Sequence, residues 1–311
     1  WLPQLDSSLT LLTTPSISRY SLCTVSCVLG SSQNATAFIS YFTISLTLSS
    51  KTSGKTFFTR NIFYFSTMEP QQISAIVIEN YGDVPIYTTK PKPVPAENQV
   101  LVKVEASTIN PSDNLFISGR YFKRPLPTTA GFEGCGRVEA VGSEALNDLI
   151  GKRVSFGSSG TGSWAEYTTS SVYFVIDEDV PVSSAASGVV NPLTVLGFLH
   201  TYRKNKHTGI IHTAAASALG RQLSRICRTE NIPLLNVVRR KEQADILKEE
   251  GAEHVVVTDG DWFPTYAELV KKLNVNALID ALGGGEVTQK LIEGLELPAT
   301  VYVYGMLTNQ P

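Results

Sequence analysis

The chain has 311 residues, of which 42% are hydrophobic, and 26 basic and 28 acidic residues leave a formal net charge of −2. This length predicts two domains, because a single core stops growing at roughly 250–300 residues. The near-zero charge argues against nucleic acid or an anionic membrane as a partner. Four scattered cysteines argue against a disulfide framework. The composition is that of an ordinary soluble protein with enough apolar residues for a sizeable core.

Residues 1–67 differ from the rest of the chain, because they are rich in Ser and Thr and contain one acid, Asp6. Two interpretations remain open. Acid-poor, Ser-rich, basic sequence is typical of a mitochondrial transit peptide. Alternatively, the segment is the conceptual translation of an untranslated region, and Met68 is the true start. This interpretation predicts a cytoplasmic protein. Under either interpretation we expect residues 1–67 to be a disordered leader or a non-native extension, outside the fold.

Residues 68–185 contain many short apolar segments separated by Gly and Pro, a pattern that predicts a barrel-like β domain. The segment VLVKVEA alternates apolar and polar residues, as a half-buried strand does. The segment GFEGCGRVEAV is rich in glycine, which indicates close backbone contacts. The expected strands are Ile73–Glu79, Val100–Ala106, Gly131–Val141, Gly151–Phe156 and Gly162–Thr168.

From residue 186 onward the pattern changes to alternating helices and strands. An apolar helix is expected over Ser187–Leu199, and further helices lie between the strands. Continuous apolar strands that alternate with helices predict a parallel sheet covered on both faces. The expected strands are Ile210–His212, Leu234–Val238, Val255–Val257, Leu278–Ala281 and Val301–Tyr304.

The segment from Gly209 to Arg240 reads as strand, small-residue turn, helix and strand, the unit that holds a dinucleotide. Its turn and helix start, TAAASALG, carry alanines where the common fingerprint has glycines. We expect the cofactor's phosphates at this helix N-terminus. Gly220 allows close packing of the helix on the strand. Ser217 and Ala218 stand where the fingerprint has glycines, and we expect the Ser217 hydroxyl to offset this by donating to a phosphate. The expected phosphate-binding residues are Ser217, Ala218, Leu219 and Gly220.

The second strand of this unit ends in VVRRK, where an NAD site would place an acid. Arg239 and Arg240 are suited to pair with a 2′-phosphate, which favours NADPH over NADH. A solvated basic loop is the alternative interpretation. We expect NADPH as the cofactor, with Arg239 as its main partner.

Five motifs follow one another in the order INPSDNLFISGRY, GFEGCGRVEAVG, GKRVSF, GSWAEY and the strand–turn–helix. In this order they resemble the medium-chain dehydrogenase/reductase superfamily, over residues Ile73 to Pro311. The resemblance implies a GroES-like β-barrel catalytic domain at residues 68–185 and a Rossmann NADPH-binding domain at residues 186–311. It also implies a sheet of six strands, of which five are visible, so we expect the Rossmann domain to be incomplete and C-terminally truncated.

The superfamily has a zinc branch and a zinc-free branch. The zinc branch places a Cys where Asn110 stands and a His where Phe132 stands, and neither residue can replace those ligands. The chain therefore resembles the zinc-free 2-enoyl thioester reductases and quinone oxidoreductases, and we expect no bound metal. The acid Glu133 follows Phe132, and we expect it to be a structural carboxylate.

The resemblance to enoyl reductases suggests further site residues. Tyr121 matches the tyrosine that is the candidate proton donor beside the nicotinamide, with packing under its loop as the alternative. Asn110 is expected to bind nicotinamide or substrate, although Asn-Pro is equally a turn signal. Thr194 in VNPLT and the turn with Gly305 and Met306 are expected to lie near the nicotinamide.

The leading hypothesis is thus an NADPH-dependent reductase of an activated alkene, most simply an enoyl thioester. An NADPH:quinone reductase is the alternative within the same class. A non-catalytic NADPH-binding protein is the alternative from a different class. The resemblance also implies a homodimer.

Overall fold

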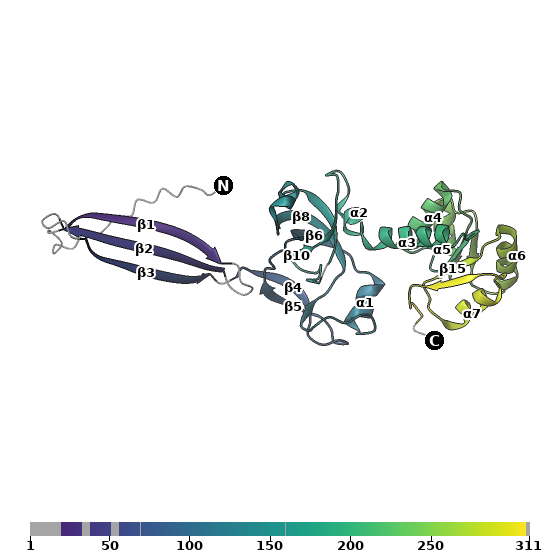
Figure 1. The fold of residues 1–311 in the computed structure, drawn as a ribbon. Helices are drawn as coiled ribbons and strands as arrows, with labels where there is room; N and C mark the ends of the chain where they lie inside the picture. The colour runs from purple at the N-terminus through teal and green to yellow at the C-terminus, as the bar shows by residue number, and fades with distance from the viewer. Residues whose placement is uncertain (1–19, 33–37, 51–55, 69, 159, 309–311) are drawn as a thin grey trace. The chain divides into compact units, whose positions relative to one another are not determined.

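The computed structural model describes residues 20–32, 38–50, 56–68, 70–158 and 160–308. The chain forms two compact units, Trp1–Gln72 and Ile73–Pro311. In the first unit three strands form an antiparallel sheet in the order β1-β2-β3, shown in purple and blue in Figure 1. These strands are β1 (Tyr20–Ser32), β2 (Phe38–Ser50) and β3 (Thr56–Met68).

These three strands lie within residues 1–67, for which we expected disorder, and that expectation stays a prediction. The segment FISYFTISLTLSS is rich in β-branched and aromatic residues, which fit a pleated surface better than a helix or an open coil. The prediction that residues 1–67 are a leader or a non-native extension stays a prediction.

Residues 72–186 form two antiparallel sheets and short helices. A five-stranded sheet has the order β10-β6-β8-β9-β11, and a three-stranded sheet has the order β5-β4-β7. The strands are β4 (Gln72–Ile78), β5 (Ile86–Pro91), β6 (Val100–Ser107), β7 (Thr128–Thr129), β8 (Glu133–Val141), β9 (Arg153–Gly157), β10 (Tyr167–Ser170) and β11 (Val172–Val175). The helices are α1 (Pro111–Ile117), the 3-10 helix η1 (Glu144–Leu149) and α2 (Val182–Ala186).

The alternating pattern of β6 buries Val100 and Val102 against Val154 and Phe156 of β9, which forms the core of this sheet. The glycine-rich strand β8 lies directly against β6. A Cβ atom at Gly136 would lie 2.0 Å from the carbonyl oxygen of Lys103, so this position requires glycine. The close backbone contact that we expected for this segment is therefore present.

Residues 190–303 form a five-stranded parallel sheet in the order β14-β13-β12-β15-β16, drawn in green to yellow in Figure 1. The strands are β12 (Ile210–His212), β13 (Leu234–Val238), β14 (Val255–Val257), β15 (Ala277–Asp280) and β16 (Thr300–Val303). The helices are α3 (Val190–Lys204), α4 (Ala218–Thr229), α5 (Lys241–Glu249), α6 (Phe263–Leu273) and α7 (Gly285–Glu293). The predicted mixed α/β fold, an antiparallel half-barrel and a Rossmann-like parallel sheet, is confirmed.

Neighbouring residues of each strand pack on opposite faces of this parallel sheet. Ile211 of β12 packs with Tyr266 of α6 and Leu291 of α7 in one core. Ile210 packs with Leu199 of α3 and with α4 residues in another. Both faces are therefore covered, which is why the strands are apolar without alternation. Within the described residues, no helix is both long and apolar enough to cross a membrane.

The Tyr266 ring is fully buried, and its hydroxyl donates to the carbonyl oxygen of Leu291 at 2.7 Å. We expect Tyr266→Phe to lower the free energy of unfolding by about 1–2 kcal/mol, because the buried carbonyl loses its partner. The same change at the exposed Tyr87 should have no measurable effect. Chemical denaturation of both variants checks this, and equal stabilities would contradict it.

Candidate functional site

A cavity of about 700 Å³ lies at the carboxyl ends of the parallel strands. This is the edge of an open α/β sheet where ligands bind. Five segments build it: the turn after β12, the end of β13 with the start of α5, and the loops after β14, β15 and β16. Its lining residues are Thr213, Ala214, Ala216, Ser217, Val237, Val238, Arg239, Gln243, Thr258, Leu282, Gly284, Gly285, Glu286, Val287, Leu307 and Thr308.

The turn after β12 brings the N-terminus of α4 to this cavity. Ser217 is the N-cap of α4, and its hydroxyl oxygen accepts from the Gly220 amide at 3.1 Å. The hydroxyl hydrogen remains able to donate to a phosphate. The amides of Ala218 and Leu219 lie in the first turn, where a helix has no acceptor of its own for them. The side chain of Ser217 lines the cavity, whereas Ala218, Leu219 and Gly220 are not among its lining residues.

Gly220 sets how closely α4 approaches β12. A Cβ atom there would lie 2.2 Å from the carbonyl oxygen of Ala215, closer than any side chain can come. Gly220 thus packs against the turn that follows β12, and its expected role in packing the helix on the strand stays a prediction. Ala214, earlier in the turn, has a φ of 51°, which L residues adopt rarely.

Asp280 at the end of β15 was missed by sequence reasoning. Its carboxylate is fully buried and accepts from the hydroxyls of Thr213 at 2.8 Å and Thr288 at 3.2 Å, and from the amides of Leu282 at 3.1 Å and Gly283 at 2.9 Å. It therefore ties the turn after β12 to the loop after β15. An acid that ends an apolar strand was the available signal.

The two arginines after β13 are placed differently. Arg239 lines the cavity, whereas Arg240 is the N-cap of α5 and is not among the lining residues. Gln243 accepts from the backbone amides of both arginines at 3.1 and 3.2 Å, which fixes the turn. The next cation, Lys241, pairs with Asp245 at 2.6 Å. Arg239 is therefore the better placed of the two for an anionic ligand.

The turn after β16 also contributes to this cavity, but not through the two residues that we predicted, Gly305 and Met306. Leu307 and Thr308 line it, while Gly305 and Met306 do not. Gly305 instead packs closely under the loop after β15, because a Cβ atom on it would lie 2.6 Å from the carbonyl oxygen of Ala281. The Thr308 hydroxyl donates to the carbonyl oxygen of Leu282 at 2.9 Å.

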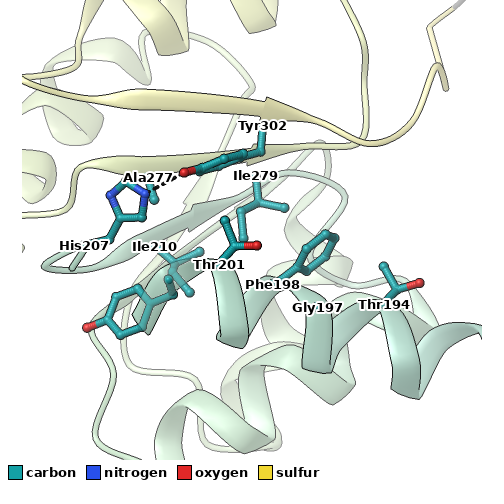
Figure 2. A pocket seen from close by; sticks show the side chains of 10 residues that line it. Thr194, Gly197, Phe198, Thr201, His207, Ile210, Ala277, Ile279 and Tyr302 are labelled. Carbon is teal, nitrogen blue, oxygen red and sulfur yellow. Dashed lines mark hydrogen bonds between the residues drawn. The ribbon is translucent and has the colours of Figure 1, made fainter. Parts of the chain in front are cut away.

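Thr194 lines a second, smaller cavity of about 290 Å³ between α3 and strands β12, β15 and β16 (Figure 2). Its walls include the rings of Phe198 and Tyr302, and the Tyr302 hydroxyl lies 2.8 Å from Nε2 of His207. The Thr194 hydroxyl donates to the carbonyl oxygen of Val190 at 2.7 Å. Thr194 thus lines the smaller cavity and not the larger one, whereas we expected it to lie near the nicotinamide of a bound cofactor.

Asn110 is the N-cap of α1 in the half-barrel region. Its side-chain amide nitrogen donates to Oε1 of Glu133 at 2.9 Å and to the Thr108 hydroxyl at 3.0 Å. Its backbone amide donates to the buried Asp113 carboxylate at 2.6 Å, the contact that the third residue of a helix makes with the N-cap in a capping box. Burial raises the pKa of Asp113 to about 6, and the neighbouring Glu133 charge adds to the rise.

Tyr121 lies at the rim of a cluster of aromatic side chains. Its ring is 53% exposed and lies 5.0 Å from the Phe122 ring and 6.2 Å from the Phe132 ring, measured between centroids. The Arg124 guanidinium lies over the rings of Phe116, Phe122 and Phe132, 5.3 to 5.6 Å from their centroids. The phenol group of Tyr121 is thus supported on its apolar side and open to a ligand.

The two positions that hold zinc ligands in the zinc branch have other functions here. Phe132 packs in the aromatic cluster, and Asn110 presents its amide nitrogen to Glu133. Among the described residues there is no group of three or more His, Cys, Asp or Glu that could hold a metal ion. Trp164 packs beside Gly131 and donates to the carbonyl oxygen of Thr108 at 2.8 Å, which is a structural contact.

Comparisons with known proteins agree with this architecture. Residues 96–181 match the alcohol dehydrogenase GroES-like domain. The chain is 31% identical over 262 residues to a mitochondrial enoyl-[acyl-carrier-protein] reductase of Arabidopsis thaliana, covering 79% of this chain and 69% of that protein.

Two solved structures extend the comparison. A putative NADPH:quinone reductase from Mesorhizobium loti has a TM-score of 0.71 and 28% identity, covering 78% of this chain and 77% of that one. A mycobacterial protein complexed with NADPH has a TM-score of 0.64 and 27% identity, covering 75% and 74%. The chain belongs to the medium-chain dehydrogenase/reductase superfamily and is an oxidoreductase.

The raised pKa of Asp113 predicts an unusual dependence of stability on pH. Because the folded protein binds this proton more tightly than the unfolded chain, the free energy of unfolding should fall as pH rises from about 4 to about 6, on the order of 2 kcal/mol. Asp113→Asn should lose this fall, and Asn at the exposed Asp148 should keep it. Denaturation curves over this pH range check it, and identical profiles for wild type and Asp113→Asn would contradict it.

Proposed function

We propose that the protein is a zinc-independent, NADPH-dependent reductase of the C=C bond of an enoyl thioester. The observation that carries this proposal is the pairing of two sites on one chain. One is a cavity at the strand ends with a helix N-terminus and Arg239, and the other is an exposed phenol beside Asn110 and Glu133. The Arabidopsis relative is an enoyl-[acyl-carrier-protein] reductase by name.

The large cavity suits a dinucleotide phosphate in its chemistry. The start of α4 offers the Ser217 hydroxyl and the first-turn amides to a pyrophosphate, and the positive end of the helix dipole favours the anion. Arg239 offers a bidentate partner to a 2′-phosphate, with Arg240 beside it. NADPH, when bound, supplies the hydride. The NADPH complex of the mycobacterial structure supports this choice of cofactor.

The chain's own residues then act on the substrate. Addition of a hydride at the β-carbon of an enoyl thioester moves negative charge to the carbonyl oxygen. The Tyr121 phenol donates to that oxygen or delivers a proton to the α-carbon, which converts the enolate to the saturated thioester. Asn110 positions nicotinamide or substrate, and Thr194, Gly305 and Met306 are proposed to shape the nicotinamide end.

A quinone is the second candidate substrate. The exposure of Tyr121 and its support by aromatic rings suit a flat, apolar electron acceptor as well as an acyl chain. The structural relative from Mesorhizobium loti is a putative NADPH:quinone reductase. A non-catalytic NADPH-binding protein, the third candidate, would use the large cavity alone.

Zinc independence rests on the residues at the two ligand positions. The Phe132 ring has no donor atom for zinc, and the Asn110 amide nitrogen is engaged with Glu133.

A mitochondrial location is supported by the name of the Arabidopsis relative and by the acid-poor, Ser-rich residues 1–67, while the cytoplasm is the alternative. The homodimer stays a prediction.

Arg239 should decide between the two cofactors. We expect Arg239→Gln to raise the Kd for NADPH about 10- to 100-fold and to leave the Kd for NADH unchanged, because only NADPH carries the 2′-phosphate. Arg240→Gln is the matched control and should have a smaller effect, since Arg240 does not line the cavity. Fluorescence titration with both nucleotides checks this. Equal wild-type affinities for NADH and NADPH would contradict it.

Tyr121 should decide between the two substrates. We expect Tyr121→Phe to lower kcat for crotonyl-CoA by about 10²-fold or more and to leave the Kd for NADPH unchanged, because only proton donation is removed. The exposed Tyr87→Phe serves as the control. NADPH oxidation with crotonyl-CoA and with a benzoquinone measures both activities. Turnover of quinone alone, insensitive to Tyr121→Phe, would replace the thioester assignment with the quinone one.

A further inference from the structure

Glu133, at the start of β8, is a buried acid that connects two distant segments. Its Oε1 atom accepts from the side chains of Asn110 at 2.9 Å and Thr108 at 3.3 Å. Its Oε2 atom accepts from the backbone amides of Val190 at 2.8 Å and Val189 at 3.2 Å, where α3 begins. One carboxylate thus holds both the Asn110 side chain and the first turn of α3.

These contacts determine which way the Asn110 amide faces. A carboxylate oxygen accepts hydrogen bonds, so the NH2 group of Asn110 must face Glu133. The same NH2 group donates to the Thr108 hydroxyl at 3.0 Å, so both of its hydrogens are engaged. What remains for a ligand is the carbonyl oxygen, Oδ1, which can only accept.

We propose that Glu133 is a positioning residue that makes Asn110 a hydrogen-bond acceptor for an amide N–H of the bound ligands. The inference rests on the proposed reductase function, because two amide N–H groups are then available. One is the carboxamide of nicotinamide, and the other is an amide of the pantetheine arm of a thioester. Asn110 consequently does not donate to the enolate oxygen, and that task stays with Tyr121.

Glu133→Gln tests this polarity directly. Gln offers one acceptor and one NH2 group, and the fixed amides of Val189 and Val190 require the acceptor. The Gln NH2 group then faces Asn110, whose amide must turn over and present its own NH2 group to the ligand. The variant keeps the size of the side chain but reverses what Asn110 offers.

The first arm measures Kd values for NADPH and for its reduced 3-acetylpyridine analogue, which has a methyl ketone in place of the carboxamide and therefore no N–H donor. We expect the wild-type protein to prefer NADPH about tenfold, which is the value of one hydrogen bond. Glu133→Gln should reduce this preference to less than about twofold, and Asn110→Ala should do the same. Glu144→Gln, at an exposed acid, should keep the wild-type preference.

The second arm tests the substrate as the source of the N–H group. It compares KM for crotonyl-pantetheine and for a crotonyl thioester of a simple alkanethiol, which lacks the amides. A preference for the pantetheine thioester that both Glu133→Gln and Asn110→Ala remove would assign the contact to the substrate. Thermal melting of each variant shows whether it is folded, and Asn110→Ala carries the test if Glu133→Gln is not.

A preference that these variants remove in either arm supports the inference and identifies the ligand. Wild-type binding of NADPH without any preference in either arm would overturn it, and so would a preference that Glu133→Gln and Asn110→Ala leave intact. A wild-type protein that fails to bind NADPH would overturn the proposed function itself, and the inference with it. The two failures are therefore distinguishable.

Discussion

The cavity at the carboxyl ends of the parallel strands depends on the absence of a side chain at Gly220. Helix α4 can start beside the end of β12 because no Cβ atom separates Gly220 from the carbonyl oxygen of Ala215, 2.2 Å from where that atom would be. This approach brings the capped N-terminus of α4, with Ser217, to the wall of the cavity. A larger residue would push the helix away and would remove the positive end of its dipole from the site.

Two buried carboxylates hold loops and helix starts in place elsewhere in the fold. Asp280 binds Thr213, the amides of Leu282 and Gly283, and Thr288, and so holds the loops on either side of the cavity. Glu133 does the same for α1 and α3. Each carboxylate is satisfied by four donors, which offsets the cost of burying it. Neither acid has a free oxygen to contribute to chemistry, so both act by holding other groups in place.

The sequence predicted the strands and helices of the fold more completely than it predicted the contacts of the candidate site. The strand Leu234–Val238 has the predicted limits, because a parallel strand covered on both faces is an uninterrupted apolar run. Partners distant in sequence leave no such pattern. Glu133 finds the amides of Val189 and Val190 more than fifty residues away. The cavity that Thr194 lines is likewise formed by the packing of α3 on the sheet, and this packing cannot be predicted from the residues of α3 alone.

Ala214 has a left-handed backbone in the alanine-rich turn that follows β12. Alanine enters this conformation less readily than glycine, so the neighbouring contacts must hold it there. It also has fewer alternative conformations to lose, both when the chain folds and when a ligand orders the turn. An alanine-rich turn is thus more rigid than a glycine-rich one, and it would lose less conformational entropy on binding any ligand.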